Sequence, residues 1–104
     1  MNIAIIPARA GSKRIPNKNI KLFFGKPVIC YPIEAALSSK IFSKVIISTD
    51  SKKIAKVAQK FGAEVPFIRP KNLSNDYTGI ADVMEHALKF LQRKNLKPNF
   101  VCCI

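Results

Sequence analysis

Apolar residues along the chain fall into two kinds of pattern, and the two kinds alternate. Short continuous runs rich in β-branched residues are typical of strands buried on both faces of a parallel sheet. They predict strands at 3–6, 44–49, 64–68 and 100–104. Apolar residues spaced three and four apart are typical of helices, and they predict helices over 29–37, 54–61 and 80–91. This alternation predicts an α/β fold with a doubly wound, mainly parallel sheet and helices on both faces.

The ends of the predicted helices carry residues that favour helix termini. Asp50 and Thr78 precede the second and third helical patterns, and both belong to the types that cap helix N-termini. Gly62 follows the second pattern and suits a position just beyond a helix C-terminus. Because capping alone accounts for Asp50, we expect this residue to have a structural role only.

Length and composition narrow the class of protein. The chain has 104 residues, of which 48% are hydrophobic, which suits one packed domain and excludes collagen-like and disordered chains. It ends inside the apolar run 100–104, which we interpret as truncation. Its three cysteines lack the spacing of a disulfide framework or a zinc site, which favours a reducing, cytoplasmic location. The apolar runs are too short for a signal peptide core or a membrane span.

Charge adds a second constraint. With 18 Lys and Arg against 6 Asp and Glu, the formal net charge is +12, so we expect an anionic partner: nucleic acid, nucleotide phosphate or acidic lipid. Six of the cations precede the first acidic residue of the chain, Glu34. They are Arg9, Lys13, Arg14, Lys18, Lys21 and Lys26.

Four of these six cations lie in segment 8–19, which follows the first predicted strand and has no helical or strand period. Ligands of open parallel sheets bind at the carboxyl ends of the strands, and cations and backbone N–H groups attract phosphate there. The segment is neither a Walker A loop nor a dinucleotide-binding Gly-x-Gly-x-x-Gly sequence. From charge and spacing alone, a solvated basic surface fits equally well.

The sequence IIPARAGSKRIPNKNI at 5–20 resembles the signature of the sugar-acid cytidylyltransferases, the family of acylneuraminate cytidylyltransferases or CMP-sialic acid synthetases. The resemblance continues over nearly the whole chain, through 25–27, 46–50, 62–67, 69–70 and 86–88. It implies a Rossmann-like nucleotide-diphospho-sugar transferase fold, of which residues 1–104 are the N-terminal, CTP-binding part of a single domain. Members of this family that activate pseudaminic acid are the most similar.

The resemblance implies a cytoplasmic transferase that is a homodimer when full length. Its partners are CTP and a nonulosonic acid, here pseudaminic acid, and neither nucleic acid nor a membrane. The anomeric hydroxyl of the sugar attacks the α-phosphate of CTP and releases pyrophosphate, a transfer catalysed mainly by positioning and charge neutralisation. The resemblance also implies Mg²⁺ as the cofactor, held by a carboxylate pair in the missing C-terminal half. No Asp-x-Asp sequence occurs in this chain.

The resemblance also assigns candidate phosphate-binding residues by their position. Lys18 and Asn19 are expected near the α-phosphate, and Arg9 and Lys18 are the expected catalytic residues. Arg14 is expected to be a solvated arginine outside the site. The residues expected to contact the triphosphate, through side chains or the backbone, are Arg9, Ala10, Gly11, Ser12 and Lys13.

The base is expected to be read by Arg69, whose guanidinium offers a rigid fork of donors to a carbonyl oxygen and a ring nitrogen. Ile80 departs from the family pattern, which often places a hydroxyl residue beside the base, so one polar contact to cytidine is in doubt. His86 is the only histidine and cannot complete a His-Glu-x-x-His zinc site, so we expect it to be packed or exposed on a helix.

Two alternatives stay open at the level of the sequence. A basic nucleic-acid-binding module fits the net charge and the helix cations, although no helix-turn-helix, zinc finger or aromatic stacking motif accompanies them. An interrupted gene product without selected activity is the other alternative, and a fragment of an enzyme can itself be inactive. The helix cations in question are Lys52, Lys53, Lys56 and Lys60.

Overall fold

The computed structural model describes residues 1–11, 18–75 and 78–104. Its central strand is β1 (Asn2–Pro7). It pairs in parallel with β4 (Lys44–Ser48) on one side and with β5 (Phe100–Cys103) on the other. In this register Ile5 lies opposite Ile46 of β4 and Cys103 of β5. Three of the four predicted strands therefore form one parallel sheet.

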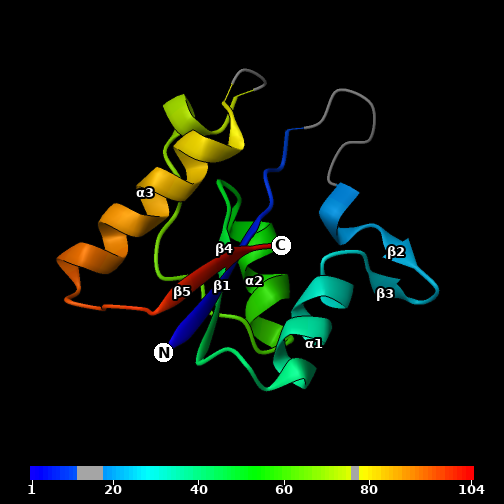
Figure 1. Ribbon diagram of the computed structural model, residues 1–104. Helices are drawn as coiled ribbons and strands as arrows, with labels where there is room; N and C mark the ends of the chain where they lie inside the picture. The colour runs from blue at the N-terminus through cyan, green and yellow to red at the C-terminus, as the bar shows by residue number, and fades with distance from the viewer. Residues whose placement is uncertain (12–17, 76–77) are drawn as a thin grey trace.

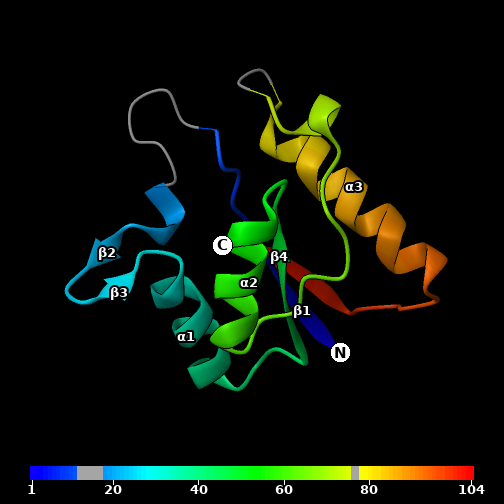
Figure 2. The same cartoon turned by 180° about the vertical axis from the view of Figure 1, so that it is seen from behind.

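Successive side chains of β1 enter two different cores, because they point to opposite faces of the sheet. On one face Ile6 packs in a cluster that includes side chains of α1 (Cys30–Ser39) and α2 (Lys52–Lys60). On the other face Ile5 packs in a cluster with side chains of α3 (Ile80–Arg93). Figures 1 and 2 show α3 on one side of the sheet and α1 and α2 on the other. Burial on both faces explains why β1 is continuously apolar rather than alternating.

The chain extends the sheet from β1 in both directions. It first runs through α1 to β4 on one side of β1, and it later returns through α3 to β5 on the other side (Figure 1). The doubly wound, mainly parallel α/β fold predicted from the sequence is confirmed. Such a sheet binds ligands beyond the carboxyl ends of its strands, at the point where the strand order reverses. That point lies at the carboxyl end of β1, where residues 8–11 follow the strand.

The predicted strand at 64–68 is wrong. The segment runs beside the outer edge of β4, but it forms only an isolated parallel bridge, between Glu64 and Ile46. Pro66 has no N–H group and cannot continue a ladder. The segment instead leads to Arg69, whose backbone N–H donates to the carbonyl oxygen of Thr49 at 2.7 Å. The result is a connection that places the Arg69 side chain at the carboxyl end of β4.

A small antiparallel hairpin was not predicted. Its strands are β2 (Leu22–Phe23) and β3 (Lys26–Pro27), and its two turn residues, Phe24 and Gly25, have φ of 50° and 83°. Positive φ at both turn residues is the geometry that matches the twist of a two-residue hairpin. Strands of two residues are too short to produce a periodic pattern, so only Gly25 signalled the turn.

Two of the predicted helix caps are also wrong, although the helices themselves are confirmed. The N-cap of α2 is Ser51, whose hydroxyl accepts from the backbone N–H of Ile54 at 3.2 Å. The N-cap of α3 is Gly79, with Thr78 one residue before it. Gly62 follows α2 with φ of 100°, as predicted. Asp50 is therefore not a helix cap, and its carboxylate has another partner, described below.

The apolar face predicted for α3 is only partly buried. Val83, Ala87 and Leu91 are buried, whereas Ile80 and Leu88 are 59% and 39% exposed. Ile80 lies at the first turn of the helix, near the carboxyl end of the sheet, where it lines a pocket. Within the described part of the chain, no helix has both the length and the apolar character needed to cross a membrane.

Candidate functional site

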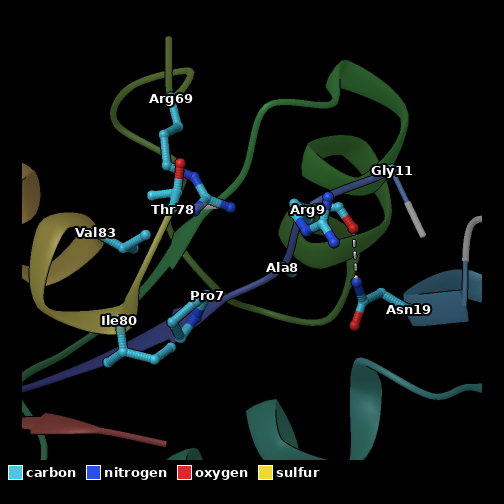
Figure 3. A pocket seen from close by; sticks show the side chains of 9 residues that line it. All are labelled: Pro7, Ala8, Arg9, Gly11, Asn19, Arg69, Thr78, Ile80 and Val83. Carbon is cyan, nitrogen blue, oxygen red and sulfur yellow. Dashed lines mark hydrogen bonds between the residues drawn. The ribbon is translucent and has the colours of Figure 1, made fainter. Parts of the chain in front are cut away.

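A pocket of about 270 Å³ opens at the carboxyl end of β1. Figure 3 shows that its lining has two ends. One end is formed by the segment that leaves β1 and by η1 (Lys18–Ile20), a short 3₁₀ turn; it contains Arg9, Gly11 and Asn19. The other end is formed by the connection before α3 and by its first turn; it contains Arg69, Thr78, Ile80 and Val83.

The Arg9 end is held by backbone contacts to neighbouring elements. The Ala8 N–H donates to the carbonyl oxygen of Ser48 at 2.9 Å, which continues the pairing of β1 with β4 beyond the strand. The Asn19 side-chain amide donates from Nδ2 to the carbonyl oxygen of Arg9 at 3.1 Å (Figure 3). These bonds fix the backbone on both sides of Arg9. The Arg9 side chain is therefore attached to the backbone at a defined position beside the pocket.

Asp50 completes this end of the site. Its Oδ1 accepts a hydrogen bond from the backbone N–H of Ala10 at 2.9 Å. The expectation that Asp50 serves only as a helix cap is thus corrected: it follows β4 and holds the segment that follows β1. The Ala10 N–H is already donated to Asp50, so in this arrangement Ala10 has no backbone donor left for a phosphate.

Arg69 forms the other end and is only 4% exposed. Its Nη1 donates to the carbonyl oxygen of Leu73 at 3.2 Å, and its Nη2 donates to that of Ser48 at 3.4 Å. Its Nε is buried and has no hydrogen-bond partner among the residues that the structure describes. A guanidinium carries five N–H groups, so Arg69 keeps donors beyond those that hold it in place.

The charges of the two ends act on each other. Burial lowers the pKa of Arg69, the negative charge of Asp50 opposes that shift, and the positive charge of Arg9 adds to it. An arginine in a protein nevertheless stays protonated. Two guanidinium groups therefore line the pocket, with the Asp50 carboxylate close enough to act on Arg69, and the excess of positive charge attracts an anion. Apolar side chains at the Arg69 end, those of Ile80 and Val83, offer a surface for a flat ring.

The structure brings together Arg9, Ala10, Gly11, Asn19 and Arg69 from the predicted set. Ser12, Lys13 and Arg14 lie outside the described residues. Lys18 opens η1, and its side chain also lies outside the described part of the chain.

Sequence reasoning missed three contributors to the pocket or its frame. Asp50 was assigned to a helix end, where its neighbour Ser51 in fact acts. Thr78 was assigned as a cap, yet it lines the pocket two residues before Ile80, where a hydroxyl was expected and is absent. Val83 was assigned only to the helix core. The family often has a hydroxyl residue where this chain has Ile80. The hydroxyl of Thr78, two positions earlier, was the signal that could have identified it as part of the pocket.

Outside the pocket, the buried cysteine and the possible metal ligands were the other candidates for chemistry among the described residues. Burial raises the pKa of Cys30, which disfavours the reactive thiolate. In residues 1–11, 18–75 and 78–104, no three His, Cys, Asp or Glu side chains gather in a way that could hold a metal ion. The described residues alone therefore do not provide a site for the Mg²⁺ that the resemblance implies.

Comparisons with known proteins identify the family of the chain. The profile of the family described as Cytidylyltransferase matches residues 3–103. A pseudaminic acid cytidylyltransferase of Campylobacter jejuni serotype O:2 is 52% identical over 103 residues, which are 99% of this chain and 44% of that protein. An N-acylneuraminate cytidylyltransferase of Escherichia coli is 45% identical over 86 residues, 83% of this chain and 20% of that protein.

A third relative is the CMP-N,N'-diacetyllegionaminic acid synthase of Legionella pneumophila, 47% identical over 91 residues, 86% of this chain and 39% of that protein. Among solved structures, CMP:2-keto-3-deoxy-manno-octonic acid synthetase complexed with CTP has the same fold, with a TM-score of 0.74 and 24% identity. That match covers 98% of this chain and 39% of the solved one.

This chain spans less than half the length of each of these three sequence relatives. The family profile covers nearly the whole chain, because it begins in β1 and ends in β5. The pocket at the carboxyl end of β1, with its two arginines, lies inside the matched region. The chain belongs to the cytidylyltransferase family.

Proposed function

We propose that this chain is the N-terminal, CTP-binding part of a single cytidylyltransferase domain that activates a nonulosonic acid. The observation that carries the proposal is the two-ended pocket at the carboxyl end of β1, with Arg9 at one end and Arg69 at the other. A nucleotide has the same division, because its phosphates are anionic and its base is a flat, polar-edged ring.

The Arg9 end suits the phosphates. Arg9 supplies a guanidinium that matches phosphate geometry, Gly11 a backbone donor, and Asn19 an amide beside Arg9. Ser12 and Lys13 complete the triphosphate contacts in this proposal. Ala10 contributes by its position rather than as a donor, because its N–H is held by Asp50.

The Arg69 end suits the cytosine base. Arg69 is fixed by two backbone carbonyls and retains donors for the carbonyl oxygen and ring nitrogen of the base. Ile80 and Val83 flank the ring, and the hydroxyl of Thr78 takes the polar place that Ile80 leaves empty. A site built from such donors discriminates strongly against a base that lacks their partners.

The reaction is nucleotidyl transfer. The anomeric oxygen of the sugar acid forms a bond to the α-phosphorus of CTP, and the bond from that phosphorus to the oxygen of pyrophosphate breaks. Arg9, Lys18 and Asn19 hold the α-phosphate and offset the negative charge that develops as pyrophosphate leaves. No step of this scheme is assigned to Mg²⁺, since the described residues provide no site for it.

The sugar acid of this proposal is pseudaminic acid. Two Campylobacter jejuni relatives, at 52% and 50% identity over 103 residues, are pseudaminic acid cytidylyltransferases. A homodimer and a cytoplasmic location complete the proposal by family resemblance. The relatives named above give no support to the alternative of nucleic-acid binding.

Isothermal titration of the 104-residue chain tests the proposal. We expect CTP to bind more tightly than inorganic tripolyphosphate, because only CTP reaches both ends of the pocket, and more tightly than UTP, because the two bases differ in their polar edges. Equal affinity for CTP and tripolyphosphate would show that the chain binds phosphate without reading a nucleotide. Tight, salt-dependent binding to duplex DNA in place of CTP would favour the alternative instead.

A further inference from the structure

Asp50 joins two parts of the site that are 40 residues apart in the sequence. It follows β4, and its Oδ1 accepts from the backbone N–H of Ala10, beyond the end of β1, at 2.9 Å. A hydrogen bond to a carboxylate is stronger than one between neutral groups. The bond acts on the middle residue of the stretch from Arg9 to Gly11, whose outer members line the pocket.

The role is distinct from helix capping. Ser51 caps α2 through its own hydroxyl, and the backbone N–H of Ser51 donates to Oγ1 of Thr49 at 3.1 Å. The local needs of this helix start are therefore met by its neighbours. The Asp50 carboxylate contributes to the geometry of a different segment, the one that carries Arg9.

The charge of Asp50 also acts on the pair of arginines. It favours the protonated form of Arg69, while Arg9 disfavours it. A carboxylate near two guanidinium groups reduces the repulsion between them. It also repels a phosphate, so its presence at an anion site calls for a compensating benefit, and the fixed position of Ala10 supplies one.

We propose that Asp50 is a positioning residue for nucleotide binding: its carboxylate oxygen holds the Ala10 N–H and thereby directs Arg9 and Gly11 toward the phosphates. The inference rests on the proposed function in taking CTP as the ligand. The hydrogen bond between Asp50 and the Ala10 N–H does not depend on the ligand, so it can be measured in the free chain.

Three variants of the 104-residue chain test the inference. Asp50→Ala removes both the acceptor and the charge, Asp50→Asn keeps an acceptor oxygen and removes only the charge, and Ser51→Ala removes the neighbouring helix cap without touching Ala10. Two quantities are measured for each: the affinity for CTP by titration calorimetry, and the hydrogen exchange rate of the Ala10 amide by NMR without nucleotide. Thermal unfolding shows that each variant is folded.

We expect Asp50→Ala to weaken CTP binding about tenfold, the scale of a lost hydrogen bond to a charged group, and to accelerate exchange at Ala10. Asp50→Asn restores most of both quantities, because its oxygen still accepts. Ser51→Ala lowers the unfolding temperature and leaves CTP affinity and Ala10 exchange unchanged.

The inference is overturned if folded Asp50→Ala binds CTP as the wild type does, or if Ser51→Ala weakens CTP binding as much as Asp50→Ala. It is also overturned if the Ala10 amide stays protected in Asp50→Ala. Absence of CTP binding both in the 104-residue chain and in a full-length enzyme that carries it contradicts the proposed function instead, and the exchange rates at Ala10 then still decide whether Asp50 holds this segment.

Discussion

Two regions of the molecule concentrate positive charge, and they differ in how the charge is held. On α2 the lysines 52, 53, 56 and 60 are all exposed, with their ammonium groups carried on flexible stems. At the carboxyl end of β1 the cationic side chains that the structure describes are those of Arg9 and Arg69. Arg69 is buried and donates to the backbone carbonyl oxygens of Leu73 and Ser48. Only the second arrangement fixes where an anion must sit.

The comparison shows why the net charge alone was ambiguous. A charge of +12 fits a solvated surface, a nucleic-acid partner or a nucleotide site equally well. Burying a guanidinium carries a cost in free energy, and a fold retains it where hydrogen bonds and a function compensate. The buried Arg69, with one N–H unpartnered among the described residues, is therefore stronger evidence for a site than four exposed lysines.

The largest expected difference between the two regions is in turnover. In a full-length enzyme that carries this chain, Arg9→Ala should lower turnover about 100-fold, the scale of deleting one electrostatic stabiliser of a transition state. Lys56→Ala on the exposed face of α2 is the matched control and should leave turnover unchanged. Steady-state kinetics of CMP-sugar formation measure both. Equal effects of the two variants would show that Arg9 contributes only to the general field of the protein.

The next largest effect is expected for a variant of Arg69, which distinguishes binding of the base from binding of the phosphates. Arg69→Met keeps most of the side-chain volume but removes the donors to the carbonyl oxygens of Leu73 and Ser48, so the free energy of unfolding should fall by about 1 kcal/mol or more. CTP affinity should fall about tenfold or more, the cost of lost charged hydrogen bonds, and tripolyphosphate affinity should change little. Titration calorimetry with both ligands measures this. A parallel loss of tripolyphosphate binding would assign Arg69 to the phosphates.

Much of the fold followed from the sequence because its strongest signals are local. The continuous apolar run of β1 and the helical spacing in α3 each reflect burial against neighbouring layers. The strand expected at 64–68 failed for a reason of pairing: its apolar composition was right, but Pro66 and the position at the edge of β4 left it a single bridge. Pairing depends on a partner segment, which composition does not describe.

The site was predictable only in part. Family resemblance placed Arg9 and Arg69 in one site, and the structure brings them to one pocket. Asp50 was misassigned because Asp and Ser are both good helix caps and stand side by side, so the local pattern could not say which one caps α2. Its bond to Ala10 spans 40 residues. Contacts of that range are set by the register of the sheet and leave no periodic trace.

A smaller effect distinguishes glycines of the site from glycines of the fold. A Cβ added at Gly11 would lie 3.6 Å from Nη1 of Arg9, an ordinary contact, so Gly11→Ala should change the free energy of unfolding by less than about 1 kcal/mol and weaken CTP binding severalfold. At Gly62, φ is 100° and the added Cβ would lie 3.1 Å from Leu37. Gly62→Ala should therefore cost about 1 kcal/mol or more of stability without affecting CTP affinity. Denaturant unfolding and calorimetry on both variants check the contrast, which the reverse pattern would contradict.

The smallest expected effect is a titration that reports the charge at the pocket. Burial lowers the pKa of His86, and the positive charges of Arg93 and Arg69 lower it further. His86 is thus neutral at pH 7, and because the unfolded chain binds its proton more readily, stability should decline as the pH falls below about 6.5.

Arg69→Met removes one of the repelling charges, so the pKa of His86 should rise slightly toward its ordinary value and the acid loss of stability should shrink. Lys56→Met, on the opposite side of the sheet, should leave it unchanged. Because the chain has a single histidine, NMR titration of its imidazole needs no site assignment. An unchanged pKa in Arg69→Met would mean that the charge of Arg69 is screened from α3, and the contrast between a fixed buried cation and the exposed lysines of α2 would then lose its electrostatic basis.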